Sequence, residues 1–163
     1  MAELRIIENF PKEGVTFVDI SPKLADKDDF SEIINKMCSF IPEGTDYIVG
    51  PESRGYIFAA PVAIKLGLGF VPIRKKGKLP EEIVYSASYE KEYGLDTICL
   101  PKNENYKGKN FYIIDDVLAT GGTLKACKEL IKQAGGNFVG AGFYINIKAL
   151  NDGVKSVGNR LMM

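Results

Sequence analysis

The sequence contains no histidine among its 163 residues. Imidazole is the usual group for proton transfer near neutral pH and the commonest metal ligand in proteins. Any proton transfer must therefore use a carboxylate, lysine, tyrosine or cysteine side chain. A bound metal is expected to be a hard ion on oxygen ligands, such as Mg²⁺.

Cysteine is scarce, and the three that occur, Cys38, Cys99 and Cys127, are far apart in the chain. Their odd number and their spacing fit neither a disulfide framework nor a metal-binding motif. We therefore expect three reduced thiols, which are typical of a cytoplasmic protein.

Long apolar runs and an excess of charge are also missing. No stretch approaches the roughly 20 apolar residues of a membrane helix, and the charged start, MAELRIIENF, lacks the apolar core of a signal peptide. Lys+Arg and Asp+Glu both number 21, so no charge excess favours duplex DNA or an anionic membrane. The length predicts a single domain over residues 1–163.

Apolar spacing along the chain predicts helices alternating with strands. Helical periodicity covers residues 28–40, 55–66 and 123–134, and β-prone runs cover 47–50, 70–73, 111–115 and 138–147. These strands are apolar without clean alternation, which predicts an α/β fold with a parallel sheet flanked by helices. Ligands of such folds bind at the carboxyl ends of the strands.

Residues 75–109 break this pattern, because the segment is polar and rich in glycine and proline. Two short β-prone pieces, 83–89 and 96–100, predict a hairpin-like flap. A long insertion of this kind in a compact domain is usually a lid or a disordered loop.

The strongest local signal is the segment FYIIDDVLATGGT at residues 111–123. An apolar strand ends in Asp115 and Asp116, and small residues then lead into a helix. A helix N-terminus offers unpaired N–H groups, and glycines allow a phosphate to come close. The carboxylates can accept hydrogen bonds from a ribose diol. The segment therefore predicts a sugar-phosphate site, formed by Asp115, Asp116, Ala119, Thr120, Gly121, Gly122 and Thr123.

Simpler interpretations exist for this segment. A threonine could merely cap the helix, and the glycines could merely form a turn. Other phosphate motifs fit less well, because no lysine follows Gly122 and no G-x-G-x-x-G opens the helix.

Several segments, in order, resemble the adenine phosphoribosyltransferases, which are type I phosphoribosyltransferases. They are FPKEGVTFVDISPKL, VGPESRGYIFAAPVA, VPIRKKGKLP, SYEKEYGLDTI and the segment at 111–123, and they run from about residue 10 to about residue 152. The resemblance implies the type I fold, with a small N-terminal hood near residues 1–25 and a flexible flap near 76–100.

The resemblance also implies roles for individual residues. Asp115 and Asp116 would bind the ribose hydroxyls, and residues 119–123 the 5′-phosphate. Pyrophosphate would be held by a loop at residues 52–55, with Ser53 and Arg54, and by Arg74, Lys75 and Lys78. Phe17 would stack on the purine while the backbone of Thr16 and Val18 reads its edge. Glu92 would manage the purine proton on the flap beside Tyr93. Taken alone, Phe17 is more often a core residue, and the basic cluster is more often a solvated surface.

The implied reaction joins adenine to phosphoribosyl pyrophosphate with Mg²⁺, which is bound mainly through the substrate, in a homodimeric enzyme. Asn146 departs from the pattern, since many relatives have Glu there, and both ends of the sequence are short. Two alternatives stay open. One is another purine base, such as hypoxanthine or guanine, and the other is a non-catalytic regulator that binds phosphoribosyl pyrophosphate or a nucleotide.

Overall fold

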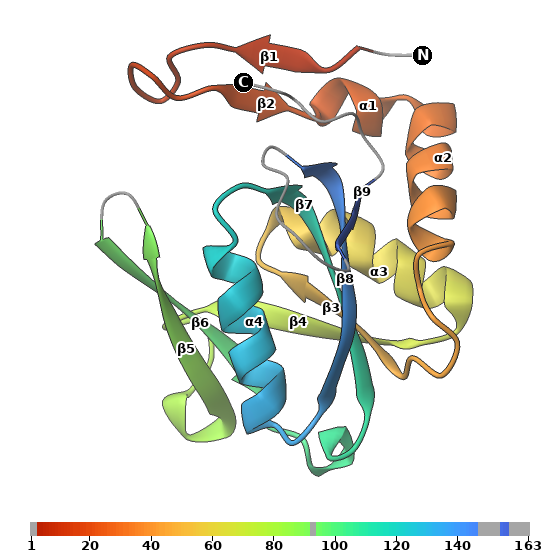
Figure 1. The fold of residues 1–163 in the computed structure, drawn as a ribbon, viewed down its shortest axis with the longest axis vertical. Helices are drawn as coiled ribbons and strands as arrows, with labels where there is room; N and C mark the ends of the chain where they lie inside the picture. Colours follow the sequence, from red (N-terminus) through yellow and green to blue (C-terminus); the bar gives the residue numbers. More distant parts are fainter. Residues whose placement is uncertain (1–2, 92–93, 147–153, 157–163) are drawn as a thin grey trace. The chain divides into compact units, whose positions relative to one another are not determined.

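The computed structural model describes residues 3–91, 94–146 and 154–156 (Figure 1). Its chain divides into two compact units, residues 1–36 and 37–163. A single domain spanning residues 1–163 stays a prediction. None of the helices within the described ranges has the length and apolar character that crossing a membrane requires.

The N-terminal unit begins with two short strands that the apolar pattern alone did not predict. Strands β1 (Arg5–Ile7) and β2 (Phe17–Asp19) pair antiparallel, with Ile6 opposite Val18. A salt bridge of 3.3 Å joins Arg5 to Asp19 across the pair. Three-residue strands carry too little periodicity to be recognised from sequence.

Two helices follow, α1 (Ser21–Ala25) and α2 (Lys27–Cys38). The Asp26 carboxylate caps α2 by accepting hydrogen bonds from the N–H groups of Asp28 and Asp29. The expected helix over 28–40 is therefore confirmed, but it ends two residues early. Ile41 precedes Pro42, and a residue before proline disfavours helical geometry.

The larger unit is built on a seven-stranded sheet in the order β5-β6-β4-β3-β7-β8-β9. Its parallel strands are β3 (Tyr47–Pro51), β4 (Gly69–Lys75), β7 (Asn110–Leu118), β8 (Asn137–Asn146) and β9 (Val154–Ser156). The predicted parallel sheet is confirmed, with β9 as an addition. The last residue of the predicted strand over 138–147 lies outside the described residues.

Two helices connect the parallel strands and cover opposite faces of the sheet (Figure 1). Helix α3 (Arg54–Leu66) leads from β3 to its neighbour β4, and α4 (Gly122–Gln133) leads from β7 to β8 on the other side. Right-handed crossovers that run in opposite directions place their helices on opposite faces. Strands β3 and β7 are adjacent, so the sheet has a topological switch point between them, where ligands of α/β folds bind.

The polar segment over 75–109 is more regular than predicted. It forms strands β5 (Val84–Lys91) and β6 (Gly94–Pro101), which pair antiparallel over eight residue positions, and β6 continues the central sheet beside β4. Short 3₁₀ turns, Glu81–Ile83 and Glu104–Tyr106, flank the hairpin. The hairpin was expected, but its pairing with the central sheet was not.

The main core of the larger unit lies between the sheet and α4. Buried Ala126, Cys127, Leu130 and Ile131 form one face of that helix. They pack with apolar side chains from β3, β4, β6, β7 and β8. This packing fixes the first turn of α4 against the end of β7, where the strongest sequence motif lies.

Candidate functional site

The turn between β7 and α4 forms a small hollow of about 70 Å³. Gly121 precedes the helix with a φ of 87°, a left-handed conformation that glycine adopts without steric cost. Pockets for whole small-molecule ligands are usually several hundred Å³. The hollow therefore suits a single phosphate-sized group, which would meet the unpaired N–H groups of the first helical turn. It is lined by Asp115, Val117, Leu118, Ala119, Thr120, Gly121, Gly122, Thr123, Leu124 and Phe143.

The two carboxylates before this turn have different surroundings. The side chain of Asp116 is buried and forms an ion pair with Arg54, with 2.6 Å between Nε and Oδ2. Asp115 accepts a hydrogen bond of 2.8 Å from the backbone N–H of Asp116. Burial, followed by the charge of Asp116, raises the pKa of Asp115 well above its ordinary value. Donors supplied by a ligand would stabilise its charged form.

Arg54 comes from the turn between β3 and α3, on the other side of the switch point. Ser53 precedes the helix, and the Glu52–Ser53 peptide bond is cis. A Cβ atom built on Gly55 would lie 2.9 Å from Oδ1 of Asp115, so only glycine lets the helix start this close to β7. The turn therefore brings its residues to the carboxylates.

Glu52 ties this turn to the end of β4. Its Oε2 accepts hydrogen bonds from the backbone N–H of Lys75 at 2.9 Å and from Nε of Arg74 at 3.2 Å. The Lys75 N–H, with help from Arg74, lowers the pKa of Glu52, and the charge of Lys78 adds to this effect. The predicted basic residues Arg74, Lys75 and Lys78 therefore lie around Glu52.

The predicted base-reading residues belong to the N-terminal unit. The ring of Phe17 is half-buried and contacts Phe10 edge-on, with 5.3 Å between ring centroids. The hydroxyl of Thr16 donates a hydrogen bond to Glu8, and the side chain of Val18 is buried. Stacking on a purine stays a prediction for Phe17.

The predicted flap residues, Glu92 and Tyr93, lie outside the described residues. The residues beside them in the chain, Lys91 and Gly94, pair with each other at the end of the hairpin.

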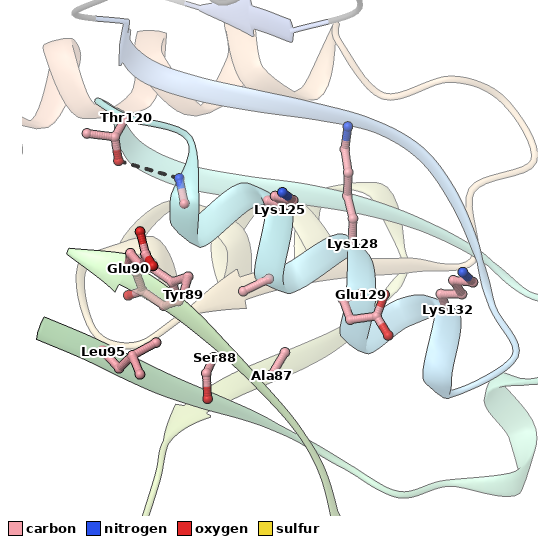
Figure 2. Close-up of a pocket in the computed structure, with 12 residues that line it drawn as sticks. Ala87, Ser88, Tyr89, Glu90, Leu95, Thr120, Lys125, Lys128, Glu129 and Lys132 are labelled. Carbon is pink, nitrogen blue, oxygen red and sulfur yellow. Dashed lines mark hydrogen bonds between the residues drawn. The ribbon is translucent and has the colours of Figure 1, made fainter.

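A second pocket of about 930 Å³ lies between this hairpin and α4 (Figure 2). Tyr89 and Glu90 line it on one side and Thr120 and Gly122 on the other. The sequence motifs predicted no role for Tyr89.

Mg²⁺ prefers hard oxygen ligands in an octahedral arrangement. Among the described residues, no group of three or more His, Cys, Asp or Glu side chains is arranged to hold a metal. Glu52 and Asp116 offer hard oxygen atoms, but both are paired with arginine. These residues fit Mg²⁺ only if the ligand's own oxygen atoms and water provide most of its coordination.

Asn146, the residue that departs from the motif, ends β8 opposite Leu118 of β7. It is buried, and its Oδ1 has no hydrogen-bond partner among the residues that the structure describes. Nothing in the described part of the chain explains why an amide occupies this position.

A family model described as "Phosphoribosyl transferase domain" matches residues 20–149. The chain is 51% identical over 146 residues to the adenine phosphoribosyltransferase of Streptococcus uberis, a match that covers 89% of this chain and 84% of that relative. It is 49% identical over the same length to the adenine phosphoribosyltransferase of Streptococcus thermophilus, with the same coverage.

Solved structures give the same result. The adenine phosphoribosyltransferase of Saccharomyces cerevisiae, crystallised with an imino-altritol bisphosphate and adenine, is similar with a TM-score of 0.86 and 39% identity, covering 94% of this chain and 93% of that chain. The enzyme of the same name from Thermoanaerobacter pseudethanolicus gives a TM-score of 0.84 and 38% identity, covering 94% and 92%.

Proposed function

Because this chain belongs to the phosphoribosyltransferase family, among the adenine phosphoribosyltransferases, we propose that it transfers the phosphoribosyl group of phosphoribosyl pyrophosphate to adenine. The products are AMP and pyrophosphate, and the reaction is one of purine salvage. One observation carries the proposal. A phosphate-sized hollow and the Arg54–Asp116 ion pair lie at the switch point of the sheet.

The phosphate turn would hold the sugar end of the substrate. The N–H groups at the start of α4 and the hydroxyls of Thr120 and Thr123 would bind the 5′-phosphate. Asp115 and Asp116 would accept hydrogen bonds from the ribose hydroxyls. Ala119, Gly121 and Gly122 would leave the space that this contact needs.

The β3–α3 turn and the end of β4 would hold the pyrophosphate. Arg54 has a planar fork that can bond two phosphate oxygens at once, and Ser53 adds a hydroxyl beside it. Arg74, Lys75 and Lys78 would add positive charge where the leaving group gains negative charge. Mg²⁺, when bound through the substrate's own oxygens, supplies further positive charge to the pyrophosphate.

The transfer would need positioning and charge stabilisation but no protein nucleophile. The bond between the anomeric carbon and pyrophosphate breaks, and a purine ring nitrogen forms the new bond from the opposite face. Glu92 would accept the proton that this nitrogen releases, which suits a chain without histidine. Phe17 would stack on the base, the backbone of Thr16 and Val18 would read its edge, and Tyr93 would accompany Glu92 on the flap.

The proposal includes a cytoplasmic homodimer. Cys38, Cys99 and Cys127 are all free thiols, which fits a reducing compartment. Near the end of α3, the side chain of Ile64 is 82% exposed, and Leu66 is also exposed. A second copy of the chain would cover this apolar surface, and light scattering on purified protein gives the mass that decides the assembly.

The deciding assay follows nucleotide formation by the purified protein, with phosphoribosyl pyrophosphate, Mg²⁺ and each of adenine, hypoxanthine, guanine and xanthine in turn. We expect AMP from adenine alone. Turnover of another base would move the specificity, whereas binding of phosphoribosyl pyrophosphate without turnover would favour a regulator. Glu92→Ala should lower kcat more than it raises either KM, and an unchanged kcat would remove Glu92 from the mechanism.

A further inference from the structure

The hairpin β5–β6 ends in a compact polar cluster of Tyr89, Lys91 and Asp96. Tyr89 lies directly opposite Asp96 across the two strands. Its hydroxyl donates a hydrogen bond of 3.3 Å to Oδ2 of Asp96, and the Lys91 ammonium forms a short ion pair with the same oxygen. The ammonium also lies 5.7 Å from the centroid of the Tyr89 ring. All three side chains therefore hold one another in place.

Asp96 is the centre of this cluster. Its second oxygen, Oδ1, accepts a hydrogen bond of 3.0 Å from the backbone N–H of Thr97, so both carboxylate oxygens are used. The hydrogen bond from Lys91 is the main reason that the pKa of Asp96 lies below its ordinary value. Asp96 therefore stays charged near neutral pH, and its position fixes the orientation of the Tyr89 hydroxyl.

The other edge of the Tyr89 ring lies against the phosphate turn. A Cβ atom built on Gly122 would come within 2.9 Å of Cδ2 of Tyr89 and 3.5 Å of the carbonyl oxygen of Glu90. Figure 2 shows Tyr89 and Glu90 facing the start of α4 below Thr120. Gly122 is the first residue of α4. The ring therefore packs against the start of the helix whose N–H groups are proposed to bind phosphate.

We propose that Asp96 is a positioning residue for the transfer reaction, acting through Tyr89 to hold the hairpin against the phosphate turn. This inference rests on the proposed function. Its consequence is a fixed spacing between the strand that leads into Glu92 and the residues that bind the 5′-phosphate. An error of about 1 Å in such a spacing can cost a hundredfold in rate. Both oxygens of Asp96 are engaged within the hairpin, so its proposed role is positioning and not contact with substrate.

The hairpin offers a matched control one residue further along. Ser88 and Thr97 also lie directly opposite each other, and their hydroxyls hydrogen-bond at 2.8 Å. Thr97→Val removes that bond without changing shape or strand preference. Neither Ser88 nor Thr97 is among the described residues nearest to a Cβ atom built on Gly122. Asp96→Asn removes the charge that anchors Lys91, and Tyr89→Phe removes only the hydroxyl.

The kinetic experiment measures kcat and both KM values for the three single variants and the double variant of Tyr89 and Asp96. We expect Asp96→Asn and Tyr89→Phe each to lower kcat on the order of tenfold. Both KM values should change less than kcat, and Thr97→Val should behave like the wild type. Because the two residues act through one contact, the double variant should be no slower than Asp96→Asn alone. Effects that multiply, or an equal loss in Thr97→Val, would overturn the inference.

Amide hydrogen exchange of the full chain without ligand provides a readout that needs no activity. In Asp96→Asn, exchange should quicken both in the hairpin and in residues 118–124. In Thr97→Val, it should quicken in the hairpin alone. Faster exchange confined to the hairpin of both variants would show that Asp96 has only a structural role. If the wild type forms no AMP, the proposed function fails, and this comparison still decides whether Asp96 positions the phosphate turn.

Discussion

Two turns of the same kind, each from a strand into a helix, form the opposite sides of the candidate site. The β7–α4 turn consists of small residues and offers mainly backbone N–H groups around a hollow. The β3–α3 turn offers charged side chains, and each of these is fixed by another strand. Glu52 is held by β4, and Arg54 pairs with Asp116 of β7.

If both turns bind phosphate as proposed, they would do so in two different ways. Backbone donors are placed by the course of the chain, so one lost side chain leaves most of them in position. Charged side chains are placed by their partners, so the loss of one partner disturbs several groups together. Substitutions in the β3–α3 turn should therefore be more harmful than those in the β7–α4 turn.

The sharpest test of this difference is Arg54→Ala. The change removes the proposed bidentate phosphate donor and leaves the buried Asp116 without its ion pair. We expect kcat/KM for phosphoribosyl pyrophosphate to fall by about 10²–10³, as for other donors aimed at developing charge. Arg54→Lys keeps the charge but lacks the fork and should recover only part of the loss. Full activity of Arg54→Lys would show that charge alone matters.

Glu52→Gln should have the next largest effect, because it weakens the link between the β3–α3 turn and Arg74. We expect KM for phosphoribosyl pyrophosphate to rise about tenfold, which corresponds to about 1.4 kcal/mol of binding. The control is Glu81→Gln, whose carboxylate lies 4.0 Å from the exposed Lys76 and should contribute little. Steady-state kinetics on both variants measures this KM. An equal rise in both would mean that binding depends on the net charge of the protein and not on the contacts of Glu52.

Thr120→Val should have a smaller effect, although Thr120 belongs to the strongest motif. Its Oγ1 accepts only a long hydrogen bond of 3.5 Å from the N–H of Gly122. The backbone donors to the phosphate stay, and Thr120 is exposed, so water can replace its hydroxyl. The expected loss is therefore about 0.5–1.5 kcal/mol. KM for phosphoribosyl pyrophosphate should rise by about two- to tenfold. A loss as large as that of Arg54→Ala would contradict the contrast between the two turns.

The smallest change is expected in stability and comes from Asp115→Asn. The pKa of Asp115 is raised in the folded chain, so the folded state binds its proton more tightly than the unfolded state does. The free energy of unfolding therefore falls as the pH rises from the ordinary pKa of an aspartate toward the raised value. At neutral pH the variant should melt a few degrees higher than the wild type while losing activity.

The control for this pH effect is Asp46→Asn. The backbone N–H of Asn110 lowers the pKa of Asp46, so its contribution has the opposite sign and disappears as the pH falls through the lowered value. Melting curves from pH 4 to pH 8 measure both variants. The melting temperature of Asp115→Asn could instead stay at or below that of the wild type at every pH. This result would show that burial of the charged Asp115 side chain does not destabilise the folded state.

Much of the fold was predictable because long elements have clear periodicity. Helices α3 and α4 and the central strands β3, β4, β7 and β8 all lie where apolar spacing placed them. The strands β1, β2 and β9 were missed because three residues are too few for a period to show. The pairing of β6 with β4 was missed because the short apolar end of β6, from Ile98 to Leu100, reveals neither its partner nor its direction.

The parts of the site that could be predicted are those whose residues are neighbours in the sequence. The β7–α4 turn was recognisable because strand, small residues and helix follow one another in the chain. The anchoring of Glu52 by Lys75 and of Arg54 by Asp116 could not be read, because these contacts join separate strands. Tyr89 gave no signal, since an aromatic residue in a strand is usual, and its contact with Gly122 depends on how the hairpin lies.

The adjacency of β3 and β7 also sets an order of events for folding. These strands neighbour each other in the sheet, although β4, β5 and β6 lie between them in the chain. Contacts across so long a loop form late and slow the search for the native state. Arg54 is synthesised early, but its ion pair with Asp116 can form only after more than half of the remaining chain has been synthesised. We expect ligand affinity to appear in the last phase of refolding, so that binding of phosphoribosyl pyrophosphate marks the completed sheet.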